Sequence, residues 1–102
     1  TLVFDEVDAG MSGQIAAVVG QLIHDVSKHT QVLCITHLAQ VAAMAEHHFN
    51  VIKKTDGKET FIEIQSLTKS QRIHEIARML GGIKITEQTL AHAEELISYN
   101  YF

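Results

Sequence analysis

The 102-residue sequence contains no proline and no tryptophan, and its only cysteine is Cys34. A single cysteine cannot form a disulfide within the chain, which fits a reducing compartment such as the cytoplasm. No apolar run approaches the roughly 20 residues that a membrane-spanning helix needs. Basic residues are also few, with 8 Lys and Arg against 12 Asp and Glu. Phosphate binding needs clustered Lys and Arg, so this balance argues against a nucleic-acid surface that works by itself.

The remaining composition is that of a folded globular protein. Hydrophobic residues make up 46% of the sequence and charged residues 20%, values that exclude a disordered chain. No repeat, low-complexity tract or internal domain boundary interrupts residues 1–102, which we expect to form one unit. The chain opens on Thr1–Phe4, an apolar run typical of the middle of a buried strand. We therefore expect a piece of a longer protein.

A βαβ unit is predicted for the first third of the chain. Thr1–Phe4 and Gln31–Thr36 are short apolar runs, typical of buried strands in a parallel sheet. The loop Val7–Gly13 holds two glycines, and Ser12 is placed to cap the helix that follows. That helix carries one apolar stripe, formed by Ile15, Val18, Val19, Leu22, Ile23 and Val26. Strands joined in this way are parallel, with a right-handed crossover.

A β-hairpin is predicted around Asp56-Gly57, which lies between two alternating runs. A two-residue turn there places Lys54 opposite Glu59. The same register pairs Phe49 with Ile64 and Val51 with Ile62 on one face that we expect to be core, with Asn50 and Glu63 on the other face.

Three more helices are expected. A short one follows directly on His37, with Leu38, Val41, Ala42 and Ala45 as its apolar positions. Thr68 and Gln71 form a capping box for the next, which Gly81-Gly82 should stop. The last begins at Thr86. The expected core positions of these two helices are Ile73, Ile76, Ala77, Leu80, Leu90, Ala93 and Ile97.

Residues that can bind a metal ion or take part in catalysis follow both strands of the predicted βαβ unit. Asp5 and Glu6 end the first strand, and His37 follows the second. Parallel strands direct their carboxyl ends to the same edge of a sheet, where open α/β sheets bind ligands. Asp5 suits a hard cation such as Mg²⁺ held through its waters. Glu6 projects differently and is available to orient and deprotonate an attacking water, with His37 contacting a terminal phosphate.

Structural alternatives exist for each of these residues. An acidic pair after an apolar strand is often a solvated loop start, and a histidine at a strand end is often structural. A zinc site is disfavoured, because His47 and His48 are adjacent and face opposite sides of a strand, and one cysteine is too few. Cys34 lies in mid-strand, where we expect a buried and inert thiol.

Three segments resemble a known family. LVFDEVDAGMSG (Leu2–Gly13) is similar to the Walker B and D-loop segment of ABC-type ATPases, with Val-Asp after the Asp-Glu pair as in SMC-like proteins. QVLCITHLAQVAAMAEHHF (Gln31–Phe49) resembles the H-loop region of the RecN family. RIHEIARMLGG (Arg72–Gly82) and TLAHAEEL (Thr89–Leu96) resemble the C-terminus of that family. The resemblance implies an α/β fold: part of a P-loop NTPase head of ABC/SMC type, in which residues 1–102 form a C-terminal lobe.

The resemblance also implies roles for single residues. Asp5 matches the Walker B aspartate that supports Mg²⁺ through water, and Glu6 matches the catalytic glutamate that polarises the hydrolytic water. His37 matches the H-loop histidine that contacts the γ-phosphate. Ser12 and Gly13 fall where SMC proteins carry an acidic D-loop residue that reaches across a head dimer, so this chain departs from the SMC pattern there.

The sequence contains no GxxxxGK[ST] phosphate loop, no evident Q-loop and no LSGG-type signature. Phosphate-loop backbone N–H groups and their lysine hold most of a nucleotide, so we expect this chain to be inactive alone and to bind no ATP or Mg²⁺. The resemblance implies a cytoplasmic, nucleoid-associated repair ATPase. Its partners are the N-terminal half of the same head, a second head in a homodimer and, through the full-length protein, DNA.

Three further expectations remain open. The chain could be a non-catalytic interaction module that docks a partner through its hairpin and last two helices. It could belong to the head of another SMC-like ATPase. In an ATPase head of the RecN family or of another SMC-like protein, the Gln31–Thr36 strand would lie beside the phosphate-loop strand. This chain lacks that neighbouring strand, so the edge should be exposed and the chain should self-associate.

Overall fold

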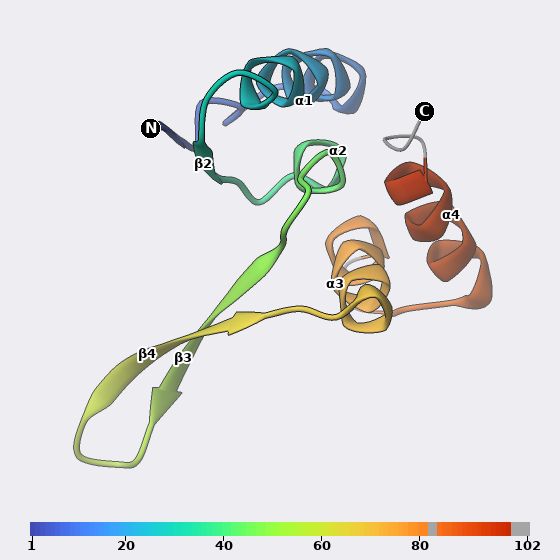
Figure 1. The fold of residues 1–102 in the computed structure, drawn as a ribbon. Helices are drawn as coiled ribbons and strands as arrows, with labels where there is room; N and C mark the ends of the chain where they lie inside the picture. The colour runs from blue at the N-terminus through green and yellow to red at the C-terminus, as the bar shows by residue number, and fades with distance from the viewer. Residues whose placement is uncertain (82–83, 99–102) are drawn as a thin grey trace.

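The computed structural model describes residues 1–81 and 84–98 and shows a mixed α/β chain. Figure 1 shows β1, α1 and β2 at one end, a β-hairpin that projects away from the helices, and α3 beside α4. The elements are β1 (Leu2–Asp5), α1 (Gly13–Ser27), β2 (Val32–Ile35), α2 (Ala39–Ala42), β3 (Phe49–Thr55), β4 (Thr60–Ser66), α3 (Lys69–Gly81) and α4 (Glu87–Ser98). No helix in the described ranges is long and apolar enough to cross a membrane.

The predicted βαβ unit is confirmed. β1 pairs in parallel with β2, from Leu2 opposite Val32 to Asp5 opposite Ile35, and α1 connects the two strands. Ser12 is the N-cap residue of α1, as predicted, with an extended backbone at φ −71° and ψ 160°. Its side chain makes no capping hydrogen bond. The parallel pairing directs both strand ends to one edge.

The predicted burial of these elements is wrong. Val3 is 63% exposed and Ile35 is 54% exposed, and Cys34, expected to be buried, is also exposed. The apolar stripe of α1 likewise faces outward at Ile15, Val18, Leu22 and Val26. The reason is that β1 and β2 form a sheet of only two strands among the described residues, and α1 packs against α2 through a different face from its apolar stripe.

The packed face of α1 consists of its smallest residues. Ala16 and Gly20 are buried. A Cβ added at Gly20 would lie 3.1 Å from the Gln40 carbonyl oxygen and 3.2 Å from the Val41 Cα. Glycine weakens a helix interior by about 1 kcal/mol relative to alanine, and this close approach to α2 explains its presence. α1 is thereby held against the segment that follows His37.

The predicted hairpin exists, but its register is wrong by two residues. β3 pairs antiparallel with β4 so that Val51 lies opposite Ile64 and Lys54 lies opposite Phe61. The loop has four residues instead of two, because the Asp56 carboxylate accepts hydrogen bonds from the backbone N–H groups of Lys58 (3.0 Å) and Glu59 (2.8 Å). These backbone donors, Glu59 first, also lower the pKa of Asp56. Such an Asx turn competes with the two-residue hairpin turn.

The hairpin face expected to be core is exposed. Phe49 and Val51 share a face with Ile62 and Ile64, as predicted, yet each of the four is between 57% and 67% exposed. Asn50 and Glu63 lie on the opposite face, also as predicted. The hairpin projects away from the helices (Figure 1), so no described element covers this face.

The predicted capping box of α3 and the predicted start of the last helix at Thr86 are confirmed. At the start of α3 the Thr68 N–H donates to Gln71 Oε1 (2.9 Å), and the Gln71 N–H donates to Thr68 Oγ1 (3.3 Å). α3 ends at Gly81, while Gly82 lies outside the described residues. Before α4 the Thr89 N–H donates to Thr86 Oγ1 (3.1 Å). Local sequence thus sets both helix starts.

The buried core lies among α2, α3 and α4. It comprises Ala39, Ala42, Ala43, Ile76, Ala77, Ala93 and Ile97. Arg72 crosses it, is only 6% exposed, and donates from Nη2 to the carbonyl oxygens of Ala42 (3.3 Å), Ala43 (3.0 Å) and Ala45 (2.5 Å). Arg72 was not among the core positions expected from the sequence. Its guanidinium ties α3 to the end of α2.

Candidate functional site

Glu6 and His37 meet at the carboxyl edge of the parallel sheet. Glu6 follows β1, and its backbone N–H donates to the Ile35 carbonyl oxygen at 2.8 Å. His37 follows β2 two residues later. The distance from His37 Nδ1 to Glu6 Oε1 is 3.7 Å, and both side chains are more than half exposed. The predicted convergence of these two residues is confirmed.

The backbone of Glu6 has an unusual conformation. Its φ is +50°, the only positive φ of a non-glycine residue in the described ranges. The left-handed region costs an L-residue about 1 kcal/mol or more. Such strain is found more often where a side chain must take a particular direction for function. Here it turns the Glu6 side chain from the β1 direction towards His37.

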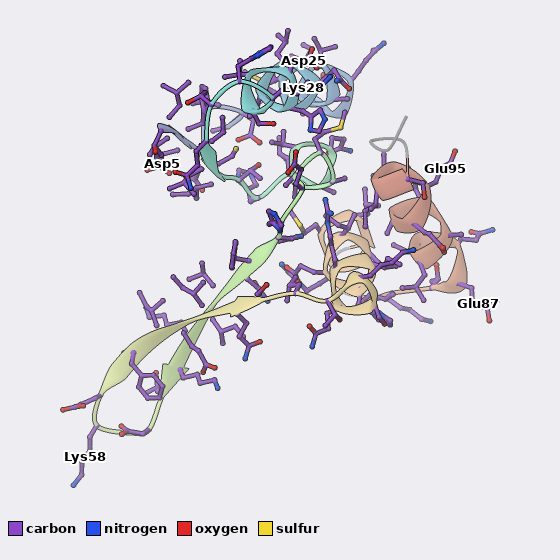
Figure 2. The ribbon with its side chains drawn as sticks, viewed as in Figure 1. Asp5, Asp25, Lys28, Lys58, Glu87 and Glu95 are labelled. Atoms are coloured by element: carbon purple, nitrogen blue, oxygen red, sulfur yellow. The ribbon has the colours of Figure 1, made fainter. Side chains whose placement is uncertain are left out.

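Asp5 is the last residue of β1 and pairs with Ile35. Its side chain is exposed, and Figure 2 shows it beside β2, on the side of the molecule away from α4. Asp5 therefore lies at the same sheet edge as Glu6 and His37. No hydrogen bond or ion pair within the described ranges joins its carboxylate to another side chain, which leaves both oxygens available to a ligand.

A third acidic residue near this edge, Asp8, was missed by the sequence analysis. Asp8 is 1% exposed and accepts a hydrogen bond at Oδ2 from the hydroxyl of Thr36. The same Thr36 oxygen accepts from the Leu38 N–H at 3.0 Å. The sequence offered one indication: a hydroxyl residue directly before His37 and an acidic residue two positions after Glu6.

Ser12 and Gly13 lie at the far end of the loop, where α1 begins. A Cβ added at Gly13 would lie 3.2 Å from the Gln40 side chain. Throughout the described residues, no hydrogen bond or ion pair connects Ser12 or Gly13 to Glu6 or His37. The structure therefore brings Asp5, Glu6 and His37 to one edge and leaves Ser12 and Gly13 apart from them.

Cys34 is unsuited to nucleophilic chemistry, and His24 makes a structural contact. Although the Cys34 side chain is exposed, desolvation by the neighbouring protein atoms, and secondly the Asp8 carboxylate, raise the pKa of its thiol, so Cys34 is a poor nucleophile at neutral pH. His24 Nδ1 lies 2.9 Å from the Met44 carbonyl oxygen and links α1 to the end of α2. In the described part of the chain, no group of three or more His, Cys, Asp or Glu side chains is placed to hold a metal ion.

The donors at the sheet edge still suit one kind of metal. Mg²⁺ keeps several waters and takes only one or two carboxylates besides phosphate oxygens. The exposed Asp5 carboxylate fits that role, whereas a metal held by protein ligands alone does not fit.

Two hollows of the described structure lie away from this edge. A hollow of about 410 Å³ is lined by residues of the α2–β3 connection and of α3, including His48 and Arg72, and a second of about 420 Å³ lies between α3 and α4. Neither is lined by Asp5, Glu6 or His37. Asp5, Glu6 and His37 therefore lie at an exposed edge of the sheet, outside both hollows.

Comparison with known proteins gives consistent results along nearly the whole chain. It is 52% identical over 97 residues to "DNA repair protein RecN" of Vibrio cholerae, which covers 95% of this chain and 18% of that relative. The protein of the same description from Haemophilus influenzae is 48% identical over 97 residues, or 95% of this chain and 17% of the relative. That from Deinococcus radiodurans is 44% identical over 98 residues, or 96% and 17%. The chain thus spans less than a fifth of the length of these curated relatives. No protein-family model matches it.

Proposed function

The chain is a homologue of a segment of the RecN DNA repair proteins, and from this premise we propose that it is the part of a RecN-type ATPase head that supplies the groups for ATP hydrolysis. The observation that carries the proposal is the meeting of Glu6 and His37 at the carboxyl edge of β1 and β2. In open α/β sheets this edge binds the ligand. Residues 1–102 then form a C-terminal lobe with Walker B, D-loop and H-loop segments, within a P-loop NTPase fold.

Each residue of the edge has a specific task in this proposal. Glu6 orients a water molecule and takes its proton as the water attacks the terminal phosphate. His37 donates a hydrogen bond to that phosphate and stabilises the charge that develops there. Asp5 holds the waters of a Mg²⁺ ion, which when bound neutralises phosphate charge. ATP and Mg²⁺ are thus the cofactors of the whole protein.

The other walls of the site come, in this proposal, from the N-terminal half of the same head. The sequence has no phosphate loop, and the apolar faces of α1 and of the hairpin are exposed. Contiguous exposed apolar surface marks a site of protein contact. These faces support packing against the remainder of the head. The exposed hairpin equally suits an interaction module of other function, but that alternative gives no role to the strained Glu6.

Mixing experiments test the proposed function. We expect the isolated chain to hydrolyse no ATP, because it supplies only one wall of the site. Addition of the N-terminal half of the head should restore turnover, measured as phosphate release in the presence of Mg²⁺. A mixture with Asp5→Asn and Glu6→Gln together in this chain is the control and should stay inactive. Equal phosphate release from the control and the unchanged mixture would contradict the proposal.

Self-association of the isolated chain is a further expectation. Both strands of the first sheet have an unpaired edge within the described residues, and β2 exposes Leu33 and Ile35. Unpaired apolar strand edges pair with other chains. Light scattering at increasing concentration should therefore give a mass above that of the 11.3 kDa chain. A monomeric mass at every concentration would exclude such pairing.

The proposal extends to the setting of the whole protein. A second head in a homodimer meets the loop that carries Ser12 and Gly13, and DNA is bound through parts of the full-length protein other than this acidic chain. The role is in double-strand-break recombinational repair, in the cytoplasm at the bacterial nucleoid. The names of the relatives support DNA repair as the setting.

A further inference from the structure

We propose that Asp8 and Thr36 form a latch that holds Glu6 and His37 in their mutual position. Asp8 belongs to the loop after β1, and Thr36 belongs to the turn after β2. Their hydrogen bond joins the two segments that carry the site. The catalytic consequence of the latch rests on the proposed function, whereas its structural consequence does not.

The Thr36 hydroxyl fixes the backbone on both sides of His37. It donates to Asp8 Oδ2 and accepts from the Leu38 N–H at 3.0 Å. Thr36 and Leu38 are the two neighbours of His37 in sequence. One hydroxyl group therefore sets the direction in which the imidazole leaves the backbone, and a hydroxyl can fill both roles because it is donor and acceptor at once.

Asp8 fixes the loop that carries Glu6. The Met11 N–H donates to the Asp8 carbonyl oxygen at 3.1 Å, and the Ala9 N–H donates to the Glu6 carbonyl oxygen at 3.2 Å. The loop is thus folded around a carboxylate that is 1% exposed. Movement of Asp8 would move Glu6, which is only two residues away.

The burial of Asp8 is not explained by stability. Its Oδ1 is buried and has no hydrogen-bond partner among the described residues. A buried carboxylate with an unpaired oxygen costs free energy, and an apolar side chain of similar size would fill the same space without that cost. Residues that lower stability in this way are usually retained for positioning or chemistry.

Glu6 and His37 cannot hold each other in place. Their closest atoms are 3.7 Å apart, which is too long for a hydrogen bond, and their side chains are 57% and 60% exposed. Ion pairs with such exposure contribute little. The last backbone link between the two segments is the one from the Glu6 N–H to Ile35. Beyond it, the bond between Asp8 and Thr36 is the one hydrogen bond that the described residues provide across this edge.

The latch is tested in the full-length protein by Thr36→Val, which keeps the shape of the side chain and removes both hydrogen bonds. We expect kcat for ATP to fall about 10- to 100-fold, because small displacements of positioned groups have effects of that size. KM for ATP should change less than about twofold. Thr36→Ser retains the hydroxyl, and Asp8→Asn retains an acceptor for the Thr36 hydroxyl. Both variants should therefore keep most of the turnover. Thr60→Val, an exposed site on the hairpin, is the matched control and should change nothing.

Hydrogen–deuterium exchange supplies a readout that does not depend on activity. Thr36→Val should increase deuterium uptake in the peptide of residues 5–12 as well as in that of residues 36–42, with the α3 peptide unchanged. Unchanged uptake in residues 5–12 would overturn the latch whatever the turnover. Increased uptake with unaltered kcat would overturn its catalytic role alone. Absence of any hydrolysis by the unsubstituted protein would instead refute the proposed function, and the exchange result would still decide whether the two segments are joined.

Discussion

Replacement of Glu6 by glutamine in the full-length protein is expected to reduce ATP turnover by about 10²- to 10⁴-fold, the range that a general base contributes. Glutamine has nearly the same shape but cannot accept a proton from water. The strained backbone at φ +50° is unaffected by this change and continues to direct the side chain towards His37. ATP should therefore bind as before. Single-turnover phosphate release and equilibrium nucleotide binding measure the two effects separately.

Glu59→Gln serves as the matched control for this experiment. Glu59 lies in the exposed hairpin loop, so the same chemical change there should leave turnover unaltered. Full turnover in the Glu6→Gln protein would show that Glu6 is not the general base. Loss of nucleotide binding in that protein would instead indicate that Glu6 holds the nucleotide in its ground state.

Arg72→Met is expected to lower the free energy of unfolding of the chain by about 3 kcal/mol. Arg72 is 6% exposed and its Nη2 donates to three carbonyl oxygens at the end of α2. Methionine fills much of the same volume but donates no hydrogen bond. Each buried acceptor left without a partner costs roughly 1–3 kcal/mol, and removal of the buried charge offsets part of that loss. Chemical denaturation followed by circular dichroism measures the change.

Arg78 provides the comparison, because it lies on the same helix in the opposite situation. It pairs with Glu75 three residues earlier, and its side chain is 60% exposed. Because Glu75 is itself only 14% exposed, Arg78→Met should lower the free energy of unfolding by about 1 kcal/mol, well below the effect of Arg72→Met. Equal effects of the two substitutions would show that the contacts of Arg72 with the end of α2 do not stabilise the core.

Local patterns predicted the secondary structure and the arrangement of the site. Helical spacing, capping residues and apolar runs placed the βαβ unit, the short helix after His37, the hairpin and the last two helices. These features depend on residues a few positions apart, and the meeting of Glu6 with His37 follows from parallel pairing alone. The proposed action of Glu6, His37 and Asp5 on ATP remains a prediction.

Features that depend on competing contacts were not predictable in this way. The hairpin register depends on whether the Asp56 carboxylate accepts from Lys58 and Glu59, and an Asp-Gly pair alone does not decide this. Burial failed for a different reason. An apolar strand indicates that its side chains can be buried. Whether they are buried within a given chain depends on the elements that pack against the strand. The burial of Arg72 and Asp8 was overlooked because a charged side chain is buried only where it has hydrogen-bond partners. The partners of these two residues lie about 30 positions away in the sequence.

The central claim is that the end of β1 and the turn after β2 form one wall of a nucleotide site. The most direct measurement is a structure of the full-length protein with Glu6→Gln, determined in the presence of Mg²⁺ and ATP. We expect the terminal phosphate within hydrogen-bond distance of His37, with the residue-6 side chain facing the water in line with that phosphate and Asp5 contacting a metal-bound water. A triphosphate bound at another face of the protein, with His37 and residue 6 exposed to solvent, would contradict the account.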